Sequence, residues 1–265
     1  MSAYASRGDR WFSALAAGGI PLKDLPGSLR AADADGIRFI AVVPDRNNPY
    51  PRARRGEVGL VEGWSLAKIV SETVAEEADR PVKRPIVAIV DVPSQAYGRR
   101  EEAFGLHQAL AGAAGAYAKA RMAGHPIVAL IVGKAMSGAF LAHGYQANEL
   151  LALDDKEVLV HAMGKASAAR ITLRTIEELD RFAAKVPPMA YDIKHFASLG
   201  ILSRLLKVSN PDAPSTDDVS GVRREIVEAI ERARRSGTTL SNRFGSENRR
   251  ASRMVREMLK AQWYS

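Results

Sequence analysis

The stretch PIVALIVGKAMSGAFLAHG, residues 126–144, decides the fold together with its counterpart PIVAIVDVPSQAYGRREE, residues 85–102. Each begins with a run that is apolar on both faces, as in a strand covered on both sides. A loop of small and polar residues follows, and helical spacing comes after it. Strands that alternate with helices predict an α/β fold with a layered core.

The alternation continues outward from these two segments. Strands are expected at residues 37–44, 149–155 and 157–163, and helices at residues 9–17, 59–78, 103–123, 175–185, 218–235 and 247–262. Ser137 opens a further expected helix that runs toward Ala147. Asp9 is the expected N-cap of the first helix, and Thr175 with Glu178 predicts a capping box.

Length and composition are typical of a soluble globular protein. The 265 residues can bury one large core or two modest ones, and 46% of them are hydrophobic. No apolar run is long enough for a membrane span, and the first residues lack the apolar core of a signal peptide. Cysteine is absent, so disulfides and thiolate chemistry are excluded. We therefore expect a cytoplasmic protein without a membrane partner.

Positive charge is concentrated near the end of the chain. The net charge is +8, and residues 221–265 hold eleven Lys and Arg against five Glu, so 11 − 5 = +6 of it lies there. Such a surface favours an acidic partner, whereas the alternative is a solvated helical tail. Nucleic acid is not expected as a partner, because no binding motif accompanies the charge.

Backbone N–H groups of the two loops are the candidate functional groups. N–H groups at a helix N-terminus lack an intrahelical partner and lie at the positive end of the dipole, so they can hold an anion. Gly138 follows Ser137 at one helix start, and Gly98 precedes Arg99 at the other. Two such loops aimed at one point would stabilise a thioester enolate or a tetrahedral oxyanion. The structural alternative makes Ser137 an N-cap and Gly138 a packing residue.

Other kinds of catalytic site find little support. Ser137 lacks a G-x-S-x-G turn, and His143, six residues later, is badly placed to act as its base. The five histidines are scattered singly, so no metal site is expected. Neither a P-loop nor a dinucleotide-binding glycine motif occurs.

At the two loops the chain resembles the crotonase-like carboxyltransferase superfamily. VDVPSQAYGRREEAFG is similar to its strand ending in Asp-x-Pro, glycine loop and Glu-rich helix start, and GKAMSGAFLAHG is similar to its partner loop. The resemblance is closer still to the gamma subunits of biotin-independent malonate decarboxylase, through the segments IPLKDLPGSLRAADADGIRFIAVVPD, RARRGEVGLVEGW and VPPMAYDI. It covers residues 8–206.

The resemblance implies a ClpP/crotonase-like fold over residues 1–208, with stacked, roughly perpendicular β-sheets surrounded by helices, and a basic helical extension over residues 209–265. It implies a subunit that, with a beta subunit, decarboxylates a malonyl thioester on an acyl carrier protein to the acetyl thioester and carbon dioxide. No cofactor is expected on this chain, because the modified phosphopantetheine-type group belongs to the carrier. An acyl-carrier transferase subunit is a further expected partner.

By the same resemblance, the oxyanion donors lie at Gly98 or Arg99 and at Ser137 or Gly138. Both loops hold fewer glycines than the carboxyltransferase pattern, which leaves open whether one loop is structural and the beta subunit supplies the working donors. Two rival functions also stay open. One is a biotin-dependent carboxyltransferase subunit, and the other is a scaffold that binds the beta subunit and the carrier without a catalytic group.

Overall fold

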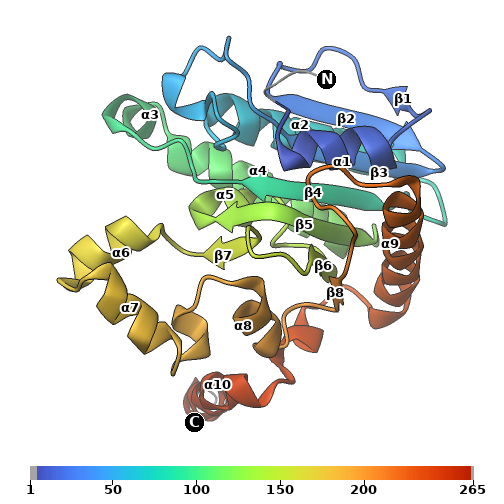
Figure 1. Cartoon of the computed structure of the whole chain (residues 1–265). Coiled ribbons are helices and arrows are strands. Elements are labelled where there is room, and N and C mark those ends of the chain that lie inside the picture. The colour runs from blue at the N-terminus through green and yellow to red at the C-terminus, as the bar shows by residue number, and fades with distance from the viewer. Residues whose placement is uncertain (1–4, 264–265) are drawn as a thin grey trace.

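A computed structural model describes residues 5–263, and its centre is an eight-stranded sheet (Figure 1). Five strands run parallel in the order β3 (Ile37–Val42), β4 (Ile86–Val92), β5 (Ile127–Met136), β6 (Glu149–Leu153) and β8 (Arg204–Leu206). Beyond β3 the sheet continues antiparallel through β2 (Leu29–Ala34) to β1 (Ile20–Pro21). All residues of β3 and β6 are buried, which accounts for their near-continuous apolar sequences.

The sheet branches at β5, which is longer than the expected strand. Its first half pairs with β6, while Lys134, Ala135 and Met136 pair with β7 (Leu159–His161). The register with β4 shifts between Val90 and Val92, close to the branch. The strands of the described residues therefore form one sheet, which branches at β5 into β6 on one path and β7 on the other.

Ten helices surround the sheet within the described residues. They are α1 (Arg7–Leu15), α2 (Leu60–Glu76), α3 (Arg99–Ala103), α4 (Leu106–Met122), α5 (Ser137–Ala142), α6 (Lys165–Thr172), α7 (Ile176–Ala183), α8 (Ile193–Ser198), α9 (Thr216–Ser236) and α10 (Arg250–Trp263). Single 3₁₀ turns lie at Pro51–Ala53, Pro187–Met189, Ser241–Phe244 and Glu247–Arg249. No helix in this part of the chain has the length and apolar character that crossing a membrane requires.

Two helix boundaries differ from expectation. Asp9 is not the N-cap of α1, because the chain enters the helix earlier and Ser6 Oγ accepts from the Asp9 N–H at 3.2 Å. Helix α5 ends at Ala142 rather than near Ala147, since Gly144 adopts a φ of +108° that no helix continues. The capping box of Thr175 and Glu178 at the start of α7 is confirmed.

The antiparallel strand β2 was not expected from the sequence. It joins β3 through Asp35 and Gly36, both with positive φ, at 49° and 75°. An Asp-Gly pair between two strands is a strong hairpin signal, because both residues tolerate this conformation. The Asp35-Gly36 pair therefore indicates a hairpin, but β2 itself is short and rich in alanine, which has weak β propensity, so the sequence did not predict a strand there.

The basic C-terminal region contains two different kinds of helix. Val222, Ile226, Ala229 and Ile230 of α9 belong to the same buried core as the sheet. Helix α10 has no buried residue. Helix α9 therefore shares the hydrophobic core of the residues before it. The division of the chain into a domain of residues 1–208 and an extension of residues 209–265 stays a prediction.

His143 is a core residue rather than a catalytic base. It is fully buried, its Nε2 lies 3.0 Å from the Ile89 carbonyl oxygen, and its Nδ1 lies 3.0 Å from the Tyr117 hydroxyl. Burial disfavours the imidazolium and lowers the pKa of His143 to about 4, although the Ile89 carbonyl acts in the opposite direction.

The buried imidazole predicts a loss of stability in mild acid. Between about pH 6.5 and pH 4 the unfolded chain binds a proton that folded His143 does not, so the free energy of unfolding falls by about 3 kcal/mol over this window. Urea unfolding of the wild type and of His143→Asn at pH 7, 5.5 and 4.5 checks this. The variant should be less stable at pH 7 and show a flatter pH dependence. Equal slopes for the two proteins would contradict the prediction.

Candidate functional site

The loops that follow β4 and β5 contact each other through Gly138 and Gln95. The Gly138 N–H, at the start of α5, donates to Gln95 Oε1 at 2.7 Å. The backbone around Gln95 is fixed, because Val58 N–H donates to the Ser94 carbonyl at 3.0 Å and Ala96 N–H donates to the Val58 carbonyl at 2.9 Å. An amide without a helical partner thus meets an acceptor oxygen from the other loop.

The Asp91 carboxylate, near the end of β4, fixes the position of the loop that follows β5. Its Oδ1 accepts from the Lys134 N–H at 3.1 Å, and its Oδ2 accepts from the Gly8 N–H at 3.0 Å. A Cβ on Gly133 would collide with this carboxylate, which explains the glycine there. The Asp-x-Pro motif therefore holds together the end of β4, the end of β5 and the start of α1.

Ser137 has a strained backbone at the turn from β5 into α5. Its φ is +57°, in the left-handed region that non-glycine residues rarely adopt. Its side chain makes no capping hydrogen bond, so the reading of Ser137 as an N-cap is wrong, and Met136 occupies that position with extended φ and ψ. Strain of this kind costs about 1–3 kcal/mol and is typical of functional turns.

Gly98 and Arg99 lie at the start of α3, in the loop that follows β4. Gly98 is the N-cap of α3, and a Cβ there would collide with Glu101 and Arg52. Arg99 is exposed. Of the four sequence-predicted site residues, Ser137 and Gly138 border one cavity, and Gly98 and Arg99 line neither cavity described below.

The cavity at Ser137 and Gly138 is mostly apolar, with a volume of about 330 Å³. Phe140, Leu141, Tyr145, Phe196 and the imidazole of His161 are among its lining residues. The His161 Nδ1 lies 3.0 Å from the Met163 carbonyl oxygen and 3.2 Å from the Met163 nitrogen. Burial lowers the pKa of His161, so the ring is neutral at pH 7.

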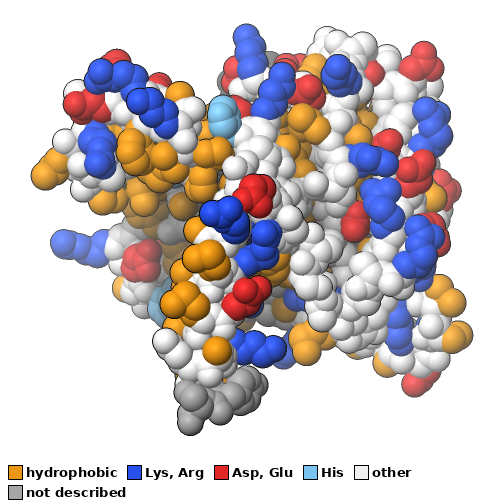
Figure 2. Space-filling model, turned by 90° about the horizontal axis from the view of Figure 1, so that it is seen from below, with side chains coloured by type: hydrophobic (Ala, Val, Ile, Leu, Met, Phe, Trp, Pro, Cys, Tyr) orange, Lys and Arg blue, Asp and Glu red, His pale blue; other side chains and the backbone are white. Residues whose placement is uncertain are grey.

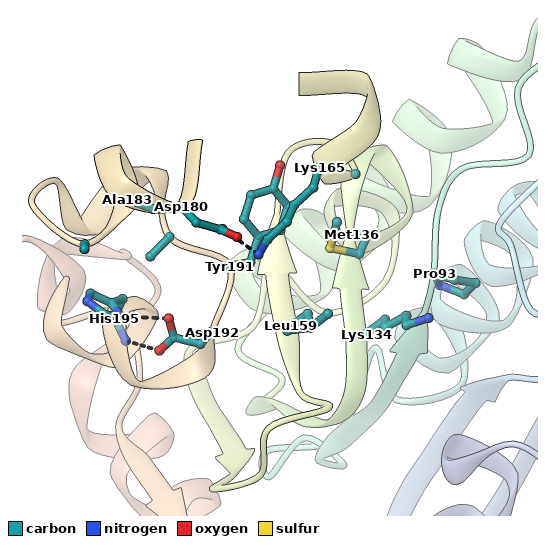
Figure 3. A pocket seen from close by; sticks show the side chains of 13 residues that line it. Pro93, Lys134, Met136, Leu159, Lys165, Asp180, Ala183, Tyr191, Asp192 and His195 are labelled. Carbon is teal, nitrogen blue, oxygen red and sulfur yellow. Dashed lines mark hydrogen bonds and ion pairs between the residues drawn. The ribbon is translucent and has the colours of Figure 1, made fainter. Parts of the chain in front are cut away.

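A second cavity of about 500 Å³ lies on the other side of β7, between the end of β5 and helices α6, α7 and α8 (Figure 3). Lys165 Nζ contacts Asp180 Oδ1 at 2.6 Å, and His195 Nδ1 contacts Asp192 Oδ2 at 2.7 Å. The rings of His161 and Tyr191 stack with their centres 3.9 Å apart. Since each ring lines one cavity, the stacked pair stands between the two.

Sequence reasoning missed His161, Tyr191 and Lys134 as parts of this region. His161 is one of five scattered histidines, and Lys134 follows the apolar run of residues 126–133, where the sequence predicts a loop. The pairing of β7 with the end of β5 places His161 beside Met136, and this contact leaves no local signal in the sequence. No group of three or more His, Asp or Glu side chains in residues 5–263 is arranged to hold a metal ion.

Comparisons with known proteins show which family the chain belongs to. A family model described as malonate decarboxylase gamma subunit matches residues 53–263. One chain of the Pseudomonas malonate decarboxylase hetero-tetramer in complex with coenzyme A is 60% identical, with a TM-score of 0.94 over 98% of this chain and 100% of that one. A chain of the Pseudomonas malonate decarboxylase MdcD-MdcE hetero-dimer is 59% identical, with a TM-score of 0.90 and the same coverage.

More distant relatives extend the comparison. Malonyl-S-ACP:biotin-protein carboxyltransferase MADD of Malonomonas rubra is 36% identical over 184 residues, 68% of this chain and 63% of its own length, so the chain spans less than two thirds of that relative. The transcarboxylase 12S structure is 20% identical with a TM-score of 0.55, over 78% of this chain and 35% of that one, and shows the fold alone. The crotonase-like carboxyltransferase fold is thereby confirmed, and the chain belongs to the family of malonate decarboxylase gamma subunits.

Proposed function

We propose that this chain is the gamma subunit of a malonate decarboxylase and works with a beta subunit. The pair converts a malonyl thioester on an acyl carrier protein to the acetyl thioester and carbon dioxide. Support comes from the family match and from the names of the Pseudomonas relatives. The observation that carries the mechanism is the Gly138 N–H, which faces an oxygen acceptor at the edge of a cavity.

The reaction needs a group that stabilises the negative charge of an enolate oxygen, rather than a strong acid or base. As the carbon–carbon bond to the carboxylate breaks, its electron pair moves to the thioester enolate, carbon dioxide leaves, and the α-carbon then takes a proton. A preorganised N–H aimed at the enolate oxygen stabilises that charge as it develops. We assign this role to the Gly138 amide, with Ser137 shaping the turn that presents it. Roles for Gly98 and Arg99 stay predictions.

The Gln95 side chain marks where the substrate oxygen would lie. Its Oε1 is a neutral amide acceptor at hydrogen-bond distance from the Gly138 N–H, as a thioester carbonyl would be. Exchanging a neutral acceptor for another costs little, whereas a charged enolate oxygen makes a hydrogen bond roughly twice as strong. The amide therefore favours the developing enolate over the ground-state carbonyl.

Exposed apolar side chains support a chain that works in a complex. Ile171 and Leu173, at the end of α6, are 67% and 93% exposed, and Trp263 of α10 is 85% exposed. Figure 2 shows apolar side chains among Lys and Arg side chains on the face seen from below. Large exposed apolar surfaces mark interaction sites. We assign them to the beta subunit, and the basic surroundings to an acidic acyl carrier protein, with the transferase subunit as a further partner.

Reconstitution tests the proposed function. The purified chain alone is expected to release no carbon dioxide from malonyl-carrier thioester, and addition of the beta subunit should restore release. The physical reason is that the cavity beside Gly138 becomes a closed site only against the partner. Decarboxylation by the isolated chain at the rate of the complex would overturn the shared site.

The 36% identity to the Malonomonas carboxyltransferase favours one alternative, a biotin-dependent carboxyl transfer. In that case the carboxyl group would pass to biotin instead of leaving as carbon dioxide. Avidin separates the two reactions, because it sequesters biotin. Release of carbon dioxide by the reconstituted complex should be unaffected by avidin, and inhibition by avidin would establish the alternative.

A further inference from the structure

The backbone just after α5 is held by side chains from distant parts of the chain. The Arg243 guanidinium donates to the carbonyl oxygen of Tyr145, at 2.7 Å, and to that of Ala147. Two further hydrogen bonds of the same kind run from Arg121 Nε to the Gln146 carbonyl oxygen, at 3.0 Å, and from Asn242 Nδ2 to the Asn148 carbonyl oxygen, at 3.2 Å. Every carbonyl of residues 145–148 therefore has a side-chain donor.

Arg243 is a buried charge that contacts carbonyl oxygens rather than a carboxylate. The residue is only 5% exposed. Burial lowers the pKa of Arg243 to about 10, so the guanidinium stays protonated at neutral pH. Burying a charge is costly unless hydrogen bonds satisfy it. Because the donors of a guanidinium form a rigid planar fork, Arg243 fixes the two carbonyl groups relative to each other.

Tyr145, which Arg243 holds, forms one wall of the cavity at Gly138. The guanidinium carbon of Arg243 also lies 5.4 Å from the centre of the Tyr145 ring. That ring packs edge-on against Phe140, with the ring centres 5.3 Å apart, and the Tyr145 N–H donates to the Phe140 carbonyl at 3.1 Å. Phe140 lines the same cavity, in the helix that Ser137 and Gly138 begin. Arg243 thus fixes the position of this wall.

The same C-terminal segment holds a second wall of that cavity. Ser246 Oγ donates to the carbonyl oxygen of Ser198, the last residue of α8, at 2.7 Å. Asn248 Nδ2 donates to the same oxygen at 3.1 Å and to Ser198 Oγ at 3.2 Å. Phe196 in this last turn of α8 lines the cavity, and its ring centre lies 6.5 Å from that of Phe140.

Helix α10 holds the segment itself in place. Arg253 Nη1 donates to the carbonyl oxygens of Phe244 and Ser246, both at 2.7 Å. The guanidinium carbon of Arg256 lies 4.8 Å from the centre of the Phe244 ring. The chain passes α8 before it enters α10, as Figure 1 shows. Residues 242–248, the C-terminal clamp, are therefore fixed between the two cavity walls and α10.

We propose that the C-terminal clamp sets the width of the cavity at Gly138, and that Arg243 and Asn248 are positioning residues that determine which acyl groups the site accepts. That the acyl group lies in this cavity rests on the proposed function. Apolar pockets distinguish groups that differ by one methylene by about 10- to 200-fold. With its walls held, the cavity is expected to accept an unbranched malonyl group and to reject one with an ethyl branch on the α-carbon.

Acyl-group selectivity in the complex with the beta subunit tests the clamp. Arg243→Met keeps the length of the side chain and removes both hydrogen bonds. The preference for malonyl over ethylmalonyl thioester, measured as a ratio of kcat/KM values, should fall about 10-fold, with an increase in the value for ethylmalonyl thioester. A variant that is merely destabilised would lose activity on both substrates in proportion. Arg243→Lys keeps the charge and should restore part of the preference.

A second variant decides the question if Arg243→Met fails to assemble. Ser246→Ala combined with Asn248→Ala removes the hydrogen bonds to Ser198 and leaves the buried arginine in place. The preference for malonyl thioester should fall about 3-fold, as expected for the loss of net hydrogen-bond energy. The matched control is Arg224→Met, since Arg224 is exposed and does not line the cavity, and its selectivity should equal that of the wild type.

Binding of unreactive probes separates the clamp from the reaction. Acetyl-pantetheine and butyryl-pantetheine differ only in the length of the acyl group and have no carboxylate to lose. Titrated by calorimetry into the wild-type complex, the acetyl compound should bind more tightly than the butyryl compound. Both variants should bring the two affinities closer together. An equal loss of affinity for both probes would leave the segment the role of an anchor for α10 and overturn the proposal.

The two failures are distinguishable. A complex that releases carbon dioxide with wild-type selectivity and wild-type relative probe affinities in both variants refutes the clamp and leaves the proposed function intact. A complex that releases no carbon dioxide, but whose preference between the two probes depends on Arg243, refutes the proposed function and leaves the clamp.

Discussion

Replacing Gly138 with valine is expected to lower kcat for malonyl-thioester decarboxylation by about 100- to 1000-fold in the assembled complex, the usual loss on removing one oxyanion donor. A Cβ at this position would collide with Gln95 Oε1 and approach Leu110 Cδ1 at 3.3 Å. It would therefore fill the space in front of the amide where the substrate oxygen must lie. Carbon dioxide release under single-turnover conditions measures the effect on the chemical step.

The control is another helical glycine with room for a side chain. A Cβ on Gly115, in α4, would meet nothing within 4 Å. Gly115→Ala should leave turnover unchanged and stabilise the chain by up to about 1 kcal/mol. Gel filtration and thermal unfolding establish that Gly138→Val still folds and assembles. Unchanged turnover in an intact Gly138→Val complex would leave this chain the role of a scaffold.

Removing the Asp91 carboxylate is expected to lower the free energy of unfolding by about 2 to 4 kcal/mol. Asp91→Ala deprives the Lys134 and Gly8 amides of their acceptor, and hydrogen bonds to charged groups contribute about 1.5–3 kcal/mol each when buried. The two hydrogen bonds together contribute less than twice that amount, because Asp91 is only half-buried. Urea unfolding at pH 7 measures the loss as a lower midpoint with an unchanged slope.

Asp79 provides the comparison for this substitution. It is exposed, so Asp79→Ala should change stability by no more than about 0.5 kcal/mol. Equal midpoints for Asp91→Ala and Asp79→Ala would show that the Asp-x-Pro motif does not hold the two strands and α1 together.

Much of the fold was predictable because its signals are local. The apolar runs that form β4 and β5 are almost entirely buried, as expected for strands covered on both faces. The capping box at Thr175 needs only residues three apart. The two loops were correctly placed against each other because parallel neighbouring strands end at the same edge of a sheet.

The parts that could not be predicted depend on contacts distant in sequence. The sequence predicts a loop at Lys134–Met136, whereas pairing with β7, about 25 residues later, and with Val92 of β4 makes these residues a strand. The hydrogen bond from Gly138 to Gln95 spans 43 residues. The stacking of His161 on Tyr191 spans 30 residues and gives no pattern in the sequence. These contacts shape the two cavities, so the site was the less predictable part.

The most direct test of the central claim is a crystal structure of this chain with its beta subunit and a non-cleavable malonyl thioester analogue. The analogue's carbonyl oxygen is expected to accept a hydrogen bond from the Gly138 N–H, and the Gln95 side chain is expected to have moved away. A carbonyl oxygen held by amides of the beta subunit, with Gln95 still bonded to Gly138, would contradict it.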